Sequence, residues 1–330
     1  MVANLKWLIA PLVFSYPLVA LNAEVESKST NQSKLSEYVQ YIAQADVDGL
    51  VDTLVDDAAQ EGVGVSKSYL EKYFKTVELT FTTAGSLKSS AKPTFEVLVV
   101  APLLDQEDIF NTYFTQFGAS YADNRSTLNL GLGYRKLSEN KYILMGVNAF
   151  YDYEFPYNHG RTSLGLEYRT TVGEMNANWY NATTKWNIGK HGNNERALDG
   201  YDFETGVPLP YMNWAYLFLK HSKWNTEVDG AKDLNVNEAQ LRAQIPVLPG
   251  LEIETGRKFN SGAASNNENY IRISYNLVSA FTEKPKESDW VSKAAYKLES
   301  MEDRRYEKVR RENKIVKQIK KSGSVTVIGY

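Results

Sequence analysis

Three residues near the middle of the chain carry the groups of a hydrolytic site. Asp152, His159 and Ser163 supply a carboxylate, an imidazole and a hydroxyl within one short stretch, and nucleophilic hydrolysis combines these groups. The other histidines, His191 and His221, lie near expected strand ends, as His159 does. Their spacing is typical of neither a catalytic triad nor a metal site. We therefore predict polar loop histidines and no enzyme, with no catalytic, cofactor-binding or metal-ligating residue; a hydrolase is the less favoured alternative.

Ion pairing is a second chemistry that the sequence suggests, because charged residues form two sets. The first set, on the polar face of segments that alternate like β-strands, is Glu167, Arg169, Glu204, Arg242, Glu252, Glu254, Arg257 and Arg272. The second set, in a highly charged stretch near the C-terminus, is Arg304, Arg305, Lys308, Arg310, Arg311 and Glu312. For any single pair, two solvated charges are the simpler interpretation. Taken as sets, a charged tail that meets a charged lumen wall is the more economical hypothesis.

Alternating segments must position these charges. In LNLGLGYR at 128–135 the leucines and the tyrosine share one face, and the asparagine, glycines and arginine share the other, as the period of two in a strand requires. Stretches 164–169, 239–245 and 271–276 alternate in the same way. An even number of strands returns both ends of a single-chain bacterial barrel to one side. The twelve expected strands are 77–83, 94–102, 110–122, 126–135, 142–154, 160–171, 173–187, 199–209, 212–222, 235–246, 249–259 and 267–277.

Alternation alone does not separate a membrane barrel from a soluble sandwich, whose strands also alternate. Export favours the barrel, since residues 1–23 combine a basic start, an apolar run too short to span a bilayer and Ala23 before a polar stretch, as in a secretory signal peptide. Aromatic residues make up 12% of the chain and cluster near expected strand ends, which is typical of outer-membrane barrels. We predict an all-β fold, a twelve-stranded antiparallel transmembrane β-barrel in contact with outer-membrane lipid. The net charge of −3 gives no indication of nucleic-acid binding.

Links between the expected strands indicate which end of the barrel is outside. The longer polar links at 190–199, 223–235 and 260–267 all follow odd-numbered strands, and outer-membrane barrels have longer external loops than periplasmic turns. We therefore expect these links on the cell surface. Ahead of the barrel, 35–74 has apolar residues at helical spacing, which predicts short periplasmic helices.

Three ordered blocks resemble the β-domains of the intimin and invasin family, the inverse autotransporters. They are FEVLVVAPLLD at 95–105, NLGLGYR at 129–135 with its continuation through 145–152 and 161–169, and RYEKVRRENKIV at 305–316. The chain departs from the family's first block at Leu104, where an aromatic residue is usual. The resemblance implies a twelve-stranded barrel with its N-terminus in the periplasm, through which the following segment passes to the cell surface. It also implies the barrel-assembly machinery and periplasmic chaperones as partners.

The resulting domain organisation has four parts. We expect a signal peptide at 1–23, a periplasmic segment at 24–76, the barrel at 77–277, and a lumenal linker with a short tail at 278–330. The expected function is that of an outer-membrane anchor and translocator; the alternative is a stand-alone pore or structural barrel. Adhesion remains open, because no row of immunoglobulin-like domains and no residue set for a receptor is evident. The stretch 324–330 is interpreted as a passenger's first strand, a surface tail or a strand that docks back on the barrel.

Overall fold

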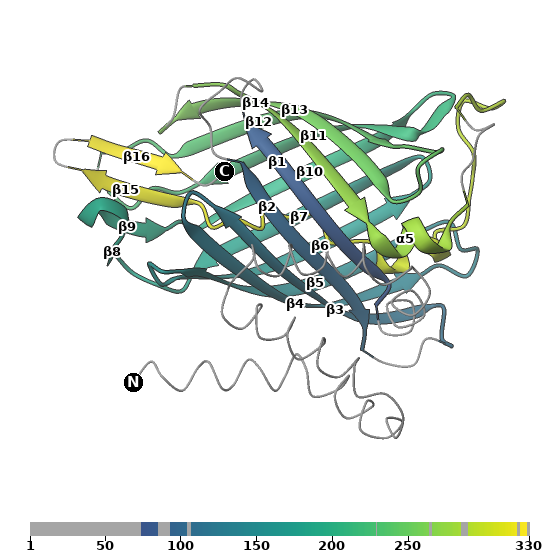
Figure 1. Ribbon diagram of the computed structural model, residues 1–330, viewed down its shortest axis with the longest axis horizontal. Coiled ribbons are helices and arrows are strands. Elements are labelled where there is room, and N and C mark those ends of the chain that lie inside the picture. Colours follow the sequence, from purple (N-terminus) through teal and green to yellow (C-terminus); the bar gives the residue numbers. More distant parts are fainter. Residues whose placement is uncertain are drawn as a thin grey trace, which may run out of the picture. The chain divides into compact units, whose positions relative to one another are not determined.

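Twelve antiparallel strands form a closed barrel in the computed structural model, which describes residues 74–84, 93–103, 107–228, 230–263, 266–284, 290–321 and 324–328 (Figure 1). The strands are β1 (Thr76–Ala84), β2 (Thr94–Pro102), β3 (Asn111–Ala122), β4 (Arg125–Leu137), β5 (Leu144–Phe155), β6 (His159–Thr170), β7 (Gly173–Ala182), β10 (Gly200–Leu209), β11 (Met212–Trp224), β12 (Leu234–Gln244), β13 (Leu251–Gly262) and β14 (Glu268–Asn276). Pairing of β1 with β14, for example Phe81 opposite Ile273, closes the ring. The predicted fold class and number of barrel strands are therefore confirmed.

Alternation of burial along each strand shows which face is the interior. In β6, residues 161, 163, 165, 167 and 169 are buried, and the residues between them are exposed. The exposed face is apolar, with Leu164 64%, Leu219 55% and Trp179 52% accessible. The buried face carries carboxylates, guanidinium groups and amides. This arrangement is the reverse of a soluble sandwich and fits a barrel that faces lipid.

Inward glycines accept aromatic rings from neighbouring strands, which fills the interior. A Cβ atom on Gly131 would lie 2.2 Å from the ring of Phe150, and one on Gly206 would lie 2.2 Å from the ring of Phe218. No side chain larger than hydrogen fits under these rings without displacing them. The small residues on the polar faces therefore serve packing.

A second sheet lies at one end of the barrel, which we call the hairpin end (Figure 1). It consists of β8 (Asn187–Ile188), β9 (Asn194–Ala197), β15 (Lys317–Lys321) and β16 (Ser324–Ile328), in the order β16-β15-β9-β8. The sequence prediction ran the strand at 173 on to 187 and treated 190–199 as a polar link, and both boundaries were wrong. Of the three interpretations of the chain's last residues, docking is the nearest, but β16 pairs with β15 and not with the barrel.

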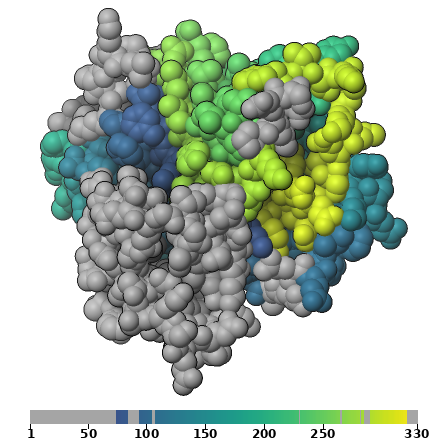
Figure 2. Space-filling view, turned by 45° about the vertical axis from the view of Figure 1, so that its right-hand side comes forward, coloured from purple at the N-terminus to yellow at the C-terminus, as the bar shows by residue number. Residues whose placement is uncertain are grey.

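The opposite end of the barrel carries α5 (Leu277–Thr282), and we call it the α5 end (Figure 1). From there the chain crosses the turns of the wall: Tyr211 exchanges backbone hydrogen bonds with Ser292 and Ala295 (2.8 and 3.0 Å), and the Met301 amide donates to Lys141 O (2.7 Å). Figure 2 brings this end forward, and the yellow atoms of the C-terminal part cover some of it. The short 3₁₀ helix η2 (Glu302–Tyr306) follows.

None of the helices in the described part of the chain has the length and apolar content needed to cross a bilayer. The expected signal peptide at 1–23 lies outside the described residues, as does all of the expected helical segment at 35–74 except Phe74.

Candidate functional site

The C-terminal segment 301–316 contacts the inward faces of most barrel strands, and we call it the lumen segment. After η2 it has no regular secondary structure until β15 begins at Lys317. Three of its apolar residues join three separate wall clusters: Met301 packs with Leu137 and Leu144, Val309 with a cluster around Phe114, and Val316 with a cluster around Trp224. The segment is therefore held at both ends and in the middle by buried apolar contacts.

Wall side chains provide the hydrogen bonds that the segment's irregular backbone lacks. Arg135 Nη1 donates to the carbonyls of Arg305 and Glu307 (2.8 and 2.7 Å), and the Val309 amide donates to Gln116 Oε1 (2.8 Å). Buried backbone groups need such partners. The other wall residues bonded to the segment's backbone are Thr76, Asn129, Arg161, Arg169, Asn178 and Tyr180. Apart from Thr76, all of these residues belong to β3–β7.

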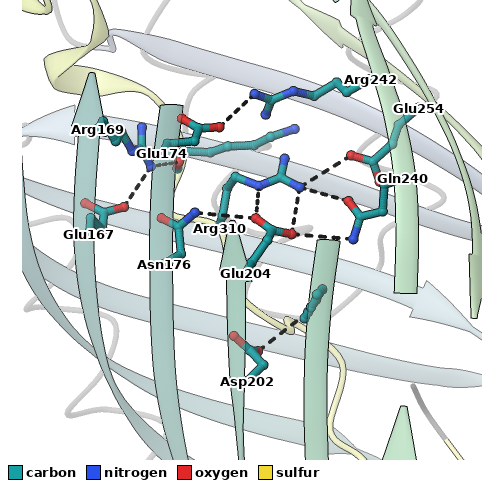
Figure 3. A network of polar contacts seen from close by, with 12 residues as sticks. Glu167, Arg169, Glu174, Asn176, Asp202, Glu204, Gln240, Arg242, Glu254 and Arg310 are labelled. Atoms are coloured by element: carbon teal, nitrogen blue, oxygen red, sulfur yellow. Dashed lines mark hydrogen bonds and ion pairs between the residues drawn. The ribbon is translucent and has the colours of Figure 1, made fainter. Parts of the chain in front are cut away.

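Arg310 of the lumen segment lies at the centre of a polar network with residues of β10, β12 and β13 (Figure 3). Its guanidinium makes two hydrogen bonds to the Glu204 carboxylate, one from Nε and one from Nη2 (3.0 Å for the latter). Nη2 also donates to Gln240 Oε1 at 3.0 Å and lies 3.6 Å from Glu254 Oε2. Two-point contact between guanidinium and carboxylate is the strongest form of this ion pair, so the network fixes both the position and the rotation of Arg310.

Asp152 binds one guanidinium of the segment and one of the wall. Arg311 donates to both carboxylate oxygens (2.9 and 2.6 Å), and Arg161 approaches from β6 at 2.8 Å. All three side chains are fully buried. Asn129 donates a further hydrogen bond to Asp152 (2.7 Å). The single carboxylate of Asp152 thus neutralises two buried cations, and it accepts one more hydrogen bond from the Asn129 amide.

Other segment charges pair with carboxylates and cations around the wall. Arg304 contacts Glu174 at 2.6 Å, and Lys308 contacts Glu78 at 2.6 Å. Arg169 contacts Glu307 of the segment at 2.9 Å. The pairs therefore reach β1, β6 and β7 as well as β5 and β10.

Arginines of the segment also stack on the aromatic rings that cover the inward glycines. The Arg311 guanidinium carbon lies 4.2 Å from the centre of the Phe150 ring, which itself covers Gly131. Cation–π contact adds attraction where the cation is shielded from water. The same three-layer arrangement is formed by Gly206, Phe218 and Arg310.

A cluster at the hairpin end ties β15 to the wall. Arg125 bridges Glu154 and Glu195 (2.8 Å each), Lys317 donates to Glu154, and His159 Nε2 lies 3.4 Å from Glu195. Burial raises the pKa of the Glu195 carboxyl, but hydrogen bonds from His159 and Arg125 more than offset it and lower the pKa to about 2. Donor atoms of Glu154, His159 and Glu195 lie within 4.8 Å of one another. Both carboxylates are already paired with cations. The cluster is therefore better suited to holding β9 and β15 against the barrel wall by ion pairs than to binding a metal ion.

Most of the predicted charge sets occupy the positions just described, with two differences. Glu167 pairs with Arg135, Arg242 with Glu174, and Arg272 with Glu254. Arg257 was predicted to face the lumen, and this is wrong: it shares the exposed face of β13 because it is an odd number of residues from the inward Glu254. Arg305 bonds only to the Glu302 carbonyl (3.0 Å) and packs on its neighbour's ring, so it has no wall carboxylate among the described residues.

Sequence reasoning missed several residues that now carry the site. Asp152, Glu174 and Glu78 are the wall carboxylates that pair with Arg311, Arg304 and Lys308. The period of two did place Arg135 on the polar face of its strand, but its hydrogen bonds to the segment's backbone were not predicted. The other pairs depend on where the segment lies inside the barrel, and the alternation of residues along the strands gives no information about that position.

A polar cavity of about 100 Å³ remains beside the segment. Its lining comes from the part of the wall opposite β3–β7, including Thr80, Lys258 and Arg272, and from segment residues 308–314. A cavity of this size admits water.

The residues of the less favoured hydrolase alternative do not combine into a catalytic group in the described part of the chain. The prediction of loop histidines is wrong for His159 and His221, which lie in β6 and β11. His159 pairs with Glu195, His221 Nδ1 bonds to Asn237, and the Ser163 hydroxyl accepts from Arg311 (3.0 Å). His191 is an exposed residue of a loop at the hairpin end. Asp152 is engaged by two arginines.

Comparison with known proteins agrees with this architecture. The family model of the inverse autotransporter β-domain matches residues 23–313. Intimin of Citrobacter freundii is 26% identical over 276 residues, which cover 82% of this chain and 28% of intimin. Invasin of Yersinia enterocolitica is 25% identical over 211 residues, which cover 63% of this chain and 24% of invasin. The chain thus spans about a quarter of the length of these relatives.

Among solved structures, a membrane protein from a study of in-meso crystallization superposes with a TM-score of 0.58 at 19% identity, over 74% of this chain and 100% of that one. This likeness concerns the fold alone. Since the family model covers most of the sequence, the chain belongs to the inverse autotransporter β-domain family.

Proposed function

We propose that this chain is an outer-membrane anchor and translocator that holds its own C-terminal segment threaded through the barrel to the cell surface. The N-terminal part lies in the periplasm, the α5 end faces the periplasm and the hairpin end faces outside. The assignment of 1–23 as signal peptide, 24–76 as periplasmic segment, 77–277 as barrel and 278–330 as linker and tail forms part of this proposal, as does insertion by the barrel-assembly machinery with periplasmic chaperones.

One observation carries the proposal. Backbone groups from Arg305 to Asn313 are hydrogen-bonded by side chains of the barrel wall. A chain that merely occupied an open pore would leave these groups to water, whereas fixed partners support a threaded resident segment. The connections from β7 to β10, from β11 to β12 and from β13 to β14 all lie at the hairpin end, and their length supports the assignment of that end to the outside.

Single cysteines test the orientation, because the chain contains no cysteine. Lys232→Cys places a thiol in an exposed loop at the hairpin end, and Glu139→Cys places one in an exposed turn at the α5 end. We expect a membrane-impermeant maleimide to label position 232 in intact cells and position 139 only after the outer membrane is permeabilised. The reverse pattern refutes the orientation.

Lys320→Cys tests the threading separately. Lys320 is exposed in β15, immediately beyond the lumen segment. We expect labelling of this cysteine in intact cells. If position 232 reacts in intact cells while position 320 reacts only after permeabilisation, the segment does not pass to the surface and the anchor-translocator proposal is wrong.

A further inference from the structure

Arg257 is a cation on the outward face of the barrel wall. Its side chain lies on the same exposed face of β13 as Ile253 and Phe259. Among the described residues it makes no ion pair and no hydrogen bond; its guanidinium carbon lies 5.3 Å from the centre of the Phe259 ring. Because a guanidinium stays protonated in proteins, a permanent charge stands on a surface that is otherwise suited to lipid.

The registers of β11–β14 show where this charge lies relative to the apolar surface. Outward residues that pair across the strands form transverse rows, two of which are Ala243, Ile253, Ile273 and then Leu217, Leu241, Thr255, Ile271. The next row toward the hairpin end is Leu219, Ala239, Arg257, Asn269. Beyond it come His221, Asn237, Phe259 and finally Lys223, Asn235, Ser261. Arg257 therefore stands at the boundary between apolar and polar rows.

Asn269 adds further donors beside the guanidinium. It is the direct cross-strand partner of Arg257 and is also exposed, and side chains at such positions have Cβ atoms about 5 Å apart. Within the described residues Asn269 makes no side-chain hydrogen bond. The neighbouring outward cation, Lys223, is paired with Asp233 at 3.1 Å. Arg257 and Asn269 are thus adjacent, unused donors on the wall.

We propose that Arg257 and Asn269 bind the phosphate group of a membrane lipid at the hairpin end. The rigid fork of a guanidinium matches two phosphate oxygens, and a neighbouring amide can donate to a third. Contact with Phe259 holds the guanidinium at the wall, and the apolar rows next to it accommodate acyl chains. If the hairpin end faces outside, as proposed above, the ligand is an outer-leaflet lipid, and this last identification rests on the proposed function.

Position along the wall argues for a lipid rather than a dissolved anion. A charge on the lipid face is costly at the middle of a bilayer and much less so at the interface. Headgroup phosphates occupy that interface, directly beyond the acyl chains. An unpaired arginine at the edge of the apolar rows therefore meets a counter-ion supplied by the membrane itself.

Native mass spectrometry of the purified full chain with diphosphoryl lipid A tests the site. We expect the wild-type protein to retain the lipid, and Arg257→Gln to weaken apparent affinity about tenfold, the effect of losing a charge-assisted contact. Arg257→Lys keeps the positive charge but lacks the two-pronged guanidinium, so its apparent affinity should lie between those of the wild type and Arg257→Gln. Asn269→Ala removes neutral donors and should cost about threefold.

Lys232→Gln is the matched control, because Lys232 is an exposed loop cation at the same end but off the wall. It should retain lipid A as the wild type does. The heat-dependent gel shift of folded barrels verifies that each variant is folded. Equal retention by wild type and Arg257→Gln refutes the proposal, as does equal retention of the same glycolipid without its phosphates. Displacement of lipid A by equimolar inorganic phosphate would identify a free-anion site instead and also overturn it. Retention by purified protein does not depend on which end faces outside, so this failure is distinguishable from failure of the cysteine labelling.

Discussion

Replacement of Arg311 by methionine should destabilise the folded protein far more than the same replacement of Arg305. Arg311 makes two hydrogen bonds to Asp152, one to Ser163 and a stacking contact with Phe150. The side chain of Arg305 makes one hydrogen bond, to a backbone carbonyl of its own segment. Both residues belong to the lumen segment, and the substitution is the same, so Arg305→Met is a matched control.

The magnitudes follow from what each substitution leaves behind. Arg311→Met leaves Asp152 paired with Arg161 and Asn129, so the expected loss is about 1.5–3 kcal/mol, the value of hydrogen bonds to a charged group. Asp152→Ala leaves two buried guanidinium groups without a carboxylate, and the expected loss is about 3–5 kcal/mol. Arg305→Met should stay within about 0.5 kcal/mol.

Urea titration of the protein in detergent micelles, read by the gel shift of the folded barrel, measures these free energies of unfolding. The double variant Asp152→Ala with Arg311→Met should cost less than the sum of the two single variants, because they remove the same contact. Equal losses for Arg311→Met and Arg305→Met, together with exact additivity in the double variant, would show that the lumen segment is not held by this ion pair.

Three further predictions concern the conductance of the barrel, the ion pairs of Glu195 and the packing of Gly131. Deletion of 302–321 should raise single-channel conductance in planar bilayers well above that of the full chain, because the lumen segment contacts the inward faces of most barrel strands; equal conductance would favour a stand-alone pore. Acidification should loosen β9, and with it the paired β15: the pKa of Glu195 in β9 is lowered from 4.5 to about 2, so the stabilisation is complete above pH 4.5 and disappears as the pH falls toward 2. Faster labelling of a cysteine in β15 over that range is the readout, and a rate independent of pH contradicts it. Gly131→Val should cost about 1–3 kcal/mol in urea titration, because its Cβ would lie 2.2 Å from the Phe150 ring; an unchanged midpoint would contradict this.

Period-two alternation predicted the barrel strands, because each strand has one apolar and one polar face, and several strands match the expected bounds closely. The choice of a barrel over a sandwich needed the signal-peptide pattern, the aromatic residues and the family resemblance as well. Alternation was insufficient for β8 and β9, which are too short to show a period. The assignment of Arg257 to the lumen was an error of another kind. Glu254 and Arg257 are three residues apart, so a strict period of two places them on opposite faces of one strand, and the sequence prediction did not apply that count.

Partners within the lumen were beyond sequence reasoning for a different reason. The choice of Asp152 by Arg311, or of Glu204 by Arg310, depends on the depth at which the segment lies and on which wall it touches. No local sequence pattern predicts either the depth of the segment or the wall that it contacts. The sequence indicated that charges would meet charges, and the three apolar contacts at Met301, Val309 and Val316 set the register in which they do so.

Both parts of the wall pair with side chains of the segment, but the hydrogen bonds to its backbone come mostly from β3–β7. Residues of β3–β7 bond to the segment's backbone, as Arg135 and Gln116 do, and backbone groups are the same in every sequence except at proline. The part around β10–β13 instead contacts side chains, above all Arg310. A chain of another sequence passing through the same lumen could use the first set of contacts but not the second. The backbone contacts of β3–β7 would therefore be open to another extended polypeptide, whereas the pairs of Arg310 with Glu204 and of Arg311 with Asp152 depend on this segment's own side chains.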